Sequence, residues 1–300
     1  MKQFLLFGVL FLGASLNLLG QNSYFNLNID NDIFFVTDYY YSSGIFLQYG
    51  KEHLGDVKKD SLRTFRLFEF GQEIYTPSDR YSIDPNEYDY PYGGWAYLKL
   101  SRQKEISRNK QYELGAQVGV TGEWSLAQWM QNTYHRTVLG LTNNAWVDQL
   151  PKAVHLNIFG QYFYQKQMAG YLKYVCQNYG SLGTQRIHLG SRMGLNIGNG
   201  NVFGLGANTL YNQKEGDAFY VGINTAYVLY DYMLEGSLFN NDAPFTLENV
   251  PFRYEVEVGF ALQSNRWKFL FLYKNRSRDN TQQPKTSHHL MNITLSRFFD

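Results

Sequence analysis

The sequence has very little cysteine, little proline and a formal charge close to zero. Its 300 residues include only 1 Cys and 7 Pro, and 27 Lys and Arg balance 26 Asp and Glu to give a net charge of +1. Because Cys176 is the only cysteine, an intrachain disulfide is excluded, and no lipid-anchoring cysteine follows the N-terminal segment.

Several familiar catalytic and binding motifs are also absent. The chain has no G-x-S-x-G nucleophile motif, no glycine-rich phosphate loop, no paired-cysteine metal motif and no nucleic-acid-binding module. These absences argue against a serine hydrolase of the common type and against nucleic acid as a partner.

Long hydrophobic stretches are confined to the N-terminus. Lys2 supplies a positive charge, and the apolar run over 4–19 is interrupted only by Gly, Ser and Asn. This pattern predicts a signal peptide at 1–20, cleaved before Gln21, and a mature domain at 21–300. An N-terminal membrane anchor is the alternative, but the run is at the short end of the roughly 17–25 residues that a spanning helix needs.

Aromatic residues and glycine are abundant, with 25 Tyr, 22 Phe and 27 Gly. Large apolar residues alternate with small, polar or charged ones over 187–197, 219–229 and 254–262, which is the period of two that strands require. A soluble β protein would also alternate, but its outer face would be richer in Lys, Glu and Thr. We therefore predict an all-β transmembrane antiparallel β-barrel of ten to fourteen strands, located in the cell outer membrane.

One segment interrupts the β pattern and predicts a short inserted helix near 125–139. It contains no proline, and it has Ser125 at a plausible N-cap and Gly140 just beyond its end. Gln131 and His135 are four residues apart and so share one helical face. A neutral imidazole is well suited to accept a proton from water near neutral pH. In the simpler interpretation, His135 caps a loop or bonds to the barrel wall.

A second polar cluster starts at Asn31-Asp32, beside an apolar aromatic stretch. Oxygen-rich groups of this kind suit a hard cation such as Ca²⁺. An Asx-type turn at the end of a strand is the simpler interpretation of the same pair.

Three ordered blocks resemble the outer-membrane lipid A 3′-O-deacylase family. They are Asn31-Asp32, Thr37-Asp38 and Tyr41 to Gly44; Gly71 to Pro77 with Asp89 to Trp95; and Gln131 to His135 with Gly140, Trp146 and Gln149-Leu150. The resemblance implies a twelve-stranded barrel, most simply a monomer, that uses Ca²⁺ and water to remove the 3′-linked acyloxyacyl chain of lipid A in lipopolysaccharide. By the same resemblance, His135, Gln131 and Asn31 are the expected catalytic residues, and Asn31 and Asp32 the expected metal ligands.

The chain departs from this family at two places. Tyr90 stands where the family has Arg, so a cationic group for a phosphate or an oxyanion is missing, and Ala153-Val154 stand where the family commonly has Glu-Pro. A non-catalytic barrel, either a small porin or an inactive relative, therefore stays as the alternative function. The adjacent His288-His289 pair is expected to face solvent near the last turn.

Overall fold

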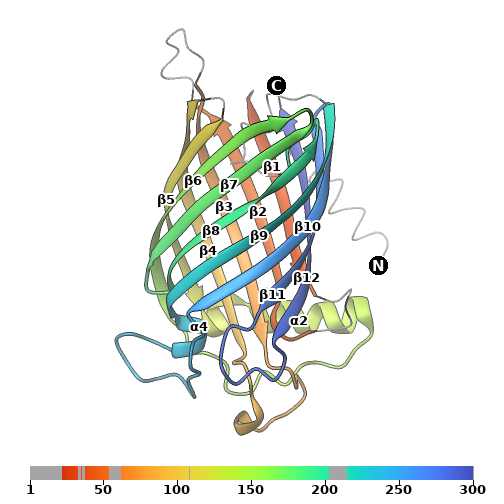
Figure 1. The fold of residues 1–300 in the computed structure, drawn as a ribbon. Coiled ribbons are helices and arrows are strands. Elements are labelled where there is room, and N and C mark those ends of the chain that lie inside the picture. Colours follow the sequence, from red (N-terminus) through yellow and green to blue (C-terminus); the bar gives the residue numbers. More distant parts are fainter. Residues whose placement is uncertain are drawn as a thin grey trace.

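Twelve antiparallel strands close into a barrel within the part of the chain that the computed structural model describes, residues 22–32, 35, 38–53, 62–107, 109–202 and 215–299 (Figure 1). The strands are β1 (Ser23–Asn31), β2 (Tyr40–Glu52), β3 (Thr64–Thr76), β4 (Gly93–Ser107), β5 (Lys110–Thr121), β6 (Val154–Ala169), β7 (Leu172–Gly183), β8 (Arg186–Gly198), β9 (Glu215–Asp231), β10 (Phe252–Ser264), β11 (Trp267–Ser277) and β12 (Ser287–Phe299). Each pairs with its sequence neighbours, and β1 also pairs with β12. The predicted barrel is confirmed, whereas the predicted signal peptide lies outside the described residues.

The predicted alternation decides which side chains face outward. In β8, Leu189, Leu195 and Ile197 are exposed on the outer wall, while Asn196 between them is fully buried. An outer wall of apolar side chains around a polar interior is the arrangement that a barrel needs in a lipid bilayer.

The two ends of the barrel differ in the length of their connections. At the end where β12 finishes, Gly170 and Asn265 adopt positive φ angles of 47° and 49° in two-residue hairpins. Positive φ at these positions is what tight hairpin turns require. The helices of the described residues and the two longest connections, 122–153 and 232–251, lie at the opposite end (Figure 1). Because outer-membrane barrels have short periplasmic turns and long outer loops, the helical end faces the outside of the cell.

The connection between β5 and β6 contains the predicted helix. It consists of a 3₁₀ turn η5 (Gly122–Ser125), the α-helix α2 (Ala127–Tyr134) and a π-helical turn η6 (His135–Leu139). Gly140 ends it with φ 68°, as expected, but Leu126 rather than Ser125 is the N-cap residue, because Ser125 belongs to the preceding 3₁₀ turn. Two short elements, η4 (Pro85–Glu87) and α4 (Tyr232–Glu235), lie in other outer loops. No helix among the described residues is long and apolar enough to cross a membrane.

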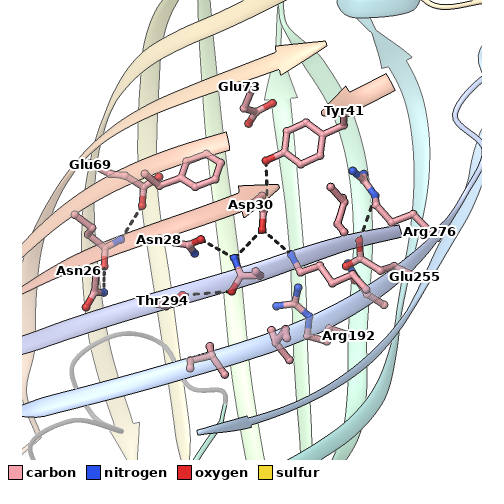
Figure 2. Close-up of a pocket in the computed structure, with 18 of the residues that line it drawn as sticks. Asn26, Asn28, Asp30, Tyr41, Glu69, Glu73, Arg192, Glu255, Arg276 and Thr294 are labelled. Carbon is pink, nitrogen blue, oxygen red and sulfur yellow. Dashed lines mark hydrogen bonds and ion pairs between the residues drawn. The ribbon is translucent and has the colours of Figure 1, made fainter. Parts of the chain in front are cut away.

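The barrel interior contains a polar cavity of about 550 Å³ (Figure 2). Several of its charged side chains form ion pairs: Lys274 lies 3.5 Å from Asp30, and Arg276 lies 3.2 Å from Glu255. Such pairing offsets much of the cost of burying charge.

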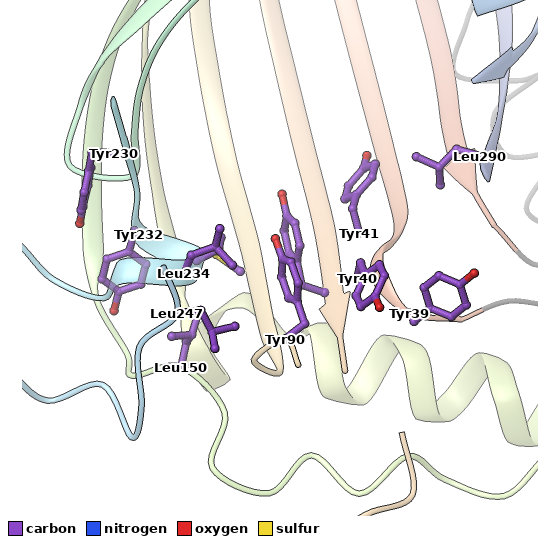
Figure 3. Close-up of a cluster of buried hydrophobic side chains, with 12 residues drawn as sticks. Tyr39, Tyr40, Tyr41, Tyr90, Leu150, Tyr230, Tyr232, Leu234, Leu247 and Leu290 are labelled. Atoms are coloured by element: carbon purple, nitrogen blue, oxygen red, sulfur yellow. The ribbon is translucent and has the colours of Figure 1, made fainter. Parts of the chain in front are cut away.

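Apolar and aromatic side chains cover this cavity on the side of the outer loops (Figure 3). We call this group the outer plug; its buried members are Tyr39, Tyr40, Tyr41, Tyr75, Tyr90, Leu150, Tyr230, Tyr232, Met233, Leu234, Leu247 and Leu290. The segment containing α2 passes beside it.

Candidate active site

A second cavity, of about 910 Å³, lies between the outer wall of the barrel and the segment that contains α2 and η6. We call it the outer groove. Its floor comes from two neighbouring strands, where Asn31 pairs with Ser43 and Ile29 pairs with Ile45. Because side chains alternate along a strand, these four residues share one face of the sheet. The floor therefore changes from polar to apolar within two residues.

The opposite wall of the outer groove has the same gradient. Gln131 and His135 of the helical segment lie near the polar part, and the segment also contributes apolar side chains. These apolar residues are Trp129, Met130, Val138, Leu139 and Leu141. A groove of this kind can hold a molecule with a polar head and hydrocarbon chains.

Asp38 contacts the side chains of three other polar residues of the groove. Its Oδ2 lies 3.0 Å from His135 Nε2 and also contacts the guanidinium of Arg80, while its Oδ1 accepts a hydrogen bond of 3.0 Å from Gln131 Nε2. Burial opposes ionisation of this carboxyl, but the contacts with His135 and Arg80 outweigh it and lower the pKa of Asp38. Asp38 is therefore an anion held by three donors.

Hydrogen bonds hold both the oxygen and the nitrogen of the Gln131 side-chain amide. Its Oε1 accepts a hydrogen bond of 2.8 Å from the indole Nε1 of Trp146, and this leaves its amide nitrogen to donate to Asp38. Trp146 is itself buried and stacks on Tyr92 with 5.0 Å between the ring centroids. The interpretation that Gln131 and His135 converge on one point is confirmed, and the point is Asp38.

His135 is only 4% exposed, and its two ring nitrogens have different surroundings. Nε2 is occupied by Asp38, whereas Nδ1 is buried and has no hydrogen-bond partner among the described residues. With Nε2–H donating to the carboxylate, Nδ1 is the nitrogen that can accept a proton. An imidazole oriented by a carboxylate is a common general base.

Asp32 makes a second contact between a carboxylate and an imidazole. Its Oδ2 lies 3.2 Å from His288 Nε2 and accepts a hydrogen bond of 3.1 Å from the backbone N–H of Tyr39. Burial raises the pKa of Asp32, and the hydrogen bond to His288 only partly opposes this effect. The expectation that His288 faces solvent is wrong, because the side chain is 4% exposed and directed at Asp32.

The ligand atoms at the polar end of the outer groove suit a hard cation that is bound with modest affinity. The side chains that line this end carry only carboxylate, hydroxyl or amide groups as ligands for a metal; they are Asn31, Asp32, Ser42 and Ser43. Asp38 is paired with Arg80 and His135, whereas Asp32, held through Oδ2 by His288 and the Tyr39 backbone, is the second carboxylate at this end. The described residues contain no group of three or more His, Cys, Asp or Glu side chains placed to hold a metal. Ca²⁺ accepts neutral oxygens and water beside a single carboxylate, so the oxygen atoms of Asn31, Asp32 and the two serines are of a type that fits this ion.

Neither departure from the family pattern lies in the outer groove. Tyr90 is fully buried in the outer plug, where it stacks on Tyr75 with 5.9 Å between centroids. Ala153 packs against the edge of the same plug. The suggestion that Tyr90 replaces a substrate-binding cation in the site is therefore not supported by its position.

Comparisons with known proteins agree with this architecture. A family model described as outer membrane protein LpxR matches residues 5–299. The solved structure of LpxR from Salmonella typhimurium superposes with a TM-score of 0.76 at 20% identity, covering 92% of this chain and 100% of that one. The β domain of the Bordetella autotransporter BrkA gives a TM-score of 0.49 at 7% identity, covering 93% of this chain and 99% of that one. No curated protein matches the sequence.

Proposed function

Because the chain belongs to the LpxR family of outer-membrane proteins, we propose that it is an ester hydrolase that removes the 3′-linked acyloxyacyl chain from lipid A. The observation that carries this proposal is the outer groove, in which the His135–Asp38 pair stands at the polar end of a hydrocarbon-lined cavity. The family resemblance of the sequence supplies the substrate and the bond.

The position of the groove suits a substrate that is part of the membrane. The floor of the groove is the outer wall of β1 and β2. On the same face of β2, Leu47 is exposed two residues beyond Ile45. A lipid A molecule in the outer leaflet would enter sideways, with its acyl chains along Ile29 and Ile45. Its ester group would then lie beside the polar residues. Because these chains already lie in hydrocarbon, the groove would hold them by van der Waals packing and not by removing them from water.

In the proposed reaction His135 is the general base. Its Nδ1 accepts a proton from the attacking water, and the positive charge that forms on the ring is stabilised by the Asp38 carboxylate at Nε2. The ester C–O bond then breaks, and the protonated ring returns the proton to the leaving sugar oxygen, so that a carboxylic acid and a 3′-hydroxyl are formed. Gln131 acts by holding Asp38 in place and by placing its amide near the ester. No serine nucleophile is needed in this scheme.

Asn31 and Asp32 are the side chains that would hold Ca²⁺ at the polar end. A bound Ca²⁺ supplies a Lewis acid that polarises the ester carbonyl and stabilises its developing negative charge. Asp32 contributes charge to this site, and Asn31 contributes a neutral oxygen that also faces the substrate.

Mass spectrometry of lipid A tests the proposal directly. Cells that express the protein should release lipid A lacking the 3′-linked acyloxyacyl chain, and cells that express His135→Ala should not. Loss of general-base help typically costs ~10²–10⁴ in rate. His135→Ala must still fold into a barrel with heat-modifiable migration on gels. Equal deacylation by wild type and His135→Ala would disprove this mechanism.

The metal requirement has its own test. Prolonged chelation should abolish deacylation, and added Ca²⁺ should restore it. Asp32→Asn should raise the Ca²⁺ concentration needed for half-maximal rate, because the substitution removes the charged ligand. Full activity of the wild type after exhaustive chelation would exclude the role of the ion.

A non-catalytic barrel is the second candidate function. The outer plug disfavours its porin form, because buried aromatic side chains cover the polar cavity at the outer end. An inactive relative would give no deacylation in the same mass-spectrometric assay.

A further inference from the structure

The contact between His288 and Asp32 crosses the seam where the barrel closes. His288 is the second residue of β12, and Asp32 directly follows β1, the strand with which β12 pairs. The two residues are 256 positions apart in the chain, yet His288 Nε2 lies 3.2 Å from Asp32 Oδ2.

Both partners of this contact are held by their surroundings. The His288 ring packs against Tyr39 and Tyr40, with centroid separations of 5.1 Å and 5.9 Å. Tyr39 also donates its backbone N–H to the same carboxylate oxygen, at 3.1 Å. Two donors on Oδ2 fix the rotation of the carboxylate, and tightly packed rings fix the imidazole.

We propose that His288 is a positioning residue that holds Asp32 in the orientation needed to bind a divalent cation at the polar end of the outer groove. This inference rests on the proposed function for the identity of the ion, Ca²⁺. Hydrogen bonds from behind a ligating carboxylate orient it and keep it ionised, and removing such a partner typically costs about 10–100-fold in metal affinity or activity. His288 itself gives no ligand to the ion.

The neighbouring histidine provides a matched control. His289 belongs to the same strand, but its Nδ1 lies 2.8 Å from the hydroxyl of Tyr273, and its ring packs on Phe35 and Tyr273. It does not line the outer groove. A change at His289 therefore perturbs the strand to a similar degree without touching Asp32.

Calorimetric titration of Ca²⁺ into the full chain, refolded in detergent, tests the proposal without depending on activity. His288→Leu keeps much of the side-chain volume but donates no hydrogen bond, so its Kd should rise about tenfold or more. His288→Gln retains an N–H donor and should recover most of the affinity. His289→Leu should bind Ca²⁺ as the wild type does.

Two further measurements separate positioning from a general structural role. Deacylation by His288→Leu should recover at saturating Ca²⁺, and adding His288→Leu to Asp32→Asn should cost little beyond Asp32→Asn alone. If His288→Leu does not migrate as a folded barrel, His288→Asn takes its place, because its shorter amide cannot reach Asp32 without a shift.

The proposal fails if the folded variant binds Ca²⁺ with the wild-type Kd, or if the wild type binds no Ca²⁺. Deacylation by the wild type, measured on the same preparation, reports separately on the proposed function. An active wild type with an unaffected His288→Leu would overturn the positioning role alone.

Discussion

At the scale of single residues, Asp38 holds the candidate site together. It receives the side chains of His135, Gln131 and Arg80, which come from two different outer loops. Removing its charge should leave Arg80 without its partner and His135 without the group that stabilises its protonated ring.

We therefore expect Asp38→Asn to lower the deacylation rate by about 10²-fold or more, since loss of the carboxylate behind a catalytic imidazole has large effects. The rate should be measured on lipid A in mixed micelles, with heat-modifiability as the test of folding. Asp30→Asn is the matched control, because Asp30 is buried in the barrel interior, where it accepts from Tyr41 and Asn292. A folded Asp38→Asn protein with the wild-type rate would contradict the assigned role.

Tyr90 allows a prediction that differs from the one its sequence position suggests. The Tyr90 hydroxyl lies 3.4 Å from Asp279 inside the outer plug, and the ring is fully buried. Tyr90→Arg should not increase the rate of deacylation, because the new guanidinium would lie in the plug and not in the groove. It should lower the temperature at which the barrel loses its compact gel migration, since a well-packed aromatic ring is lost. A rate increase on lipid A would show that this position reaches the substrate.

At the scale of secondary-structure elements, the strands and the inserted helix could be predicted because their signals are local. Alternation over 187–197 specifies which face of β8 meets lipid, and Gly140 ends the helical segment with its positive φ. The shared face of Gln131 and His135 followed from helical spacing alone.

The partners of these residues could not be predicted in the same way. Arg80 and Asp38 meet only after three strands have paired, and His288 reaches Asp32 only when the barrel closes. For the adjacent pair His288-His289, strand alternation implies that one ring turns inward but not which one, because that choice depends on the register of β12.

The groove itself makes an element-scale prediction. Ile45→Trp should fill part of the space between β2 and the helical segment, so cleavage of lipid A should fall about tenfold or more through a higher KM. Hydrolysis of a short-chain ester should be less affected. Leu47→Trp is the matched control, because Leu47 lies on the same face of the same strand but outside the groove. Equal losses in the two variants would mean that the groove does not hold the acyl chains.

At the scale of the whole molecule, the barrel separates two polar regions that serve different purposes. The interior cavity is lined by polar and charged side chains, several of them in ion pairs, and the outer groove places its polar groups on the lipid-facing wall. The proposed chemistry therefore takes place outside the barrel, and the interior need not be open to solvent for the enzyme to work.

The last prediction follows from what covers the interior cavity at its outer end. The outer plug covers it there, and a separate cluster of buried apolar side chains lies on β1, β3 and β12 toward the other end, formed by Tyr24, Phe65, Leu67 and Phe298. Tyr24 lies at the start of β1 and Phe298 near the end of β12, which places this cluster at the periplasmic rim. An ion crossing the barrel would have to pass the buried aromatic side chains of the outer plug, where loss of its hydration water has a large cost in free energy.

The purified protein should therefore give no stable conductance steps in planar bilayers, while a small porin reconstituted in parallel should give them. Discrete steps from the heat-modifiable protein would instead favour the porin.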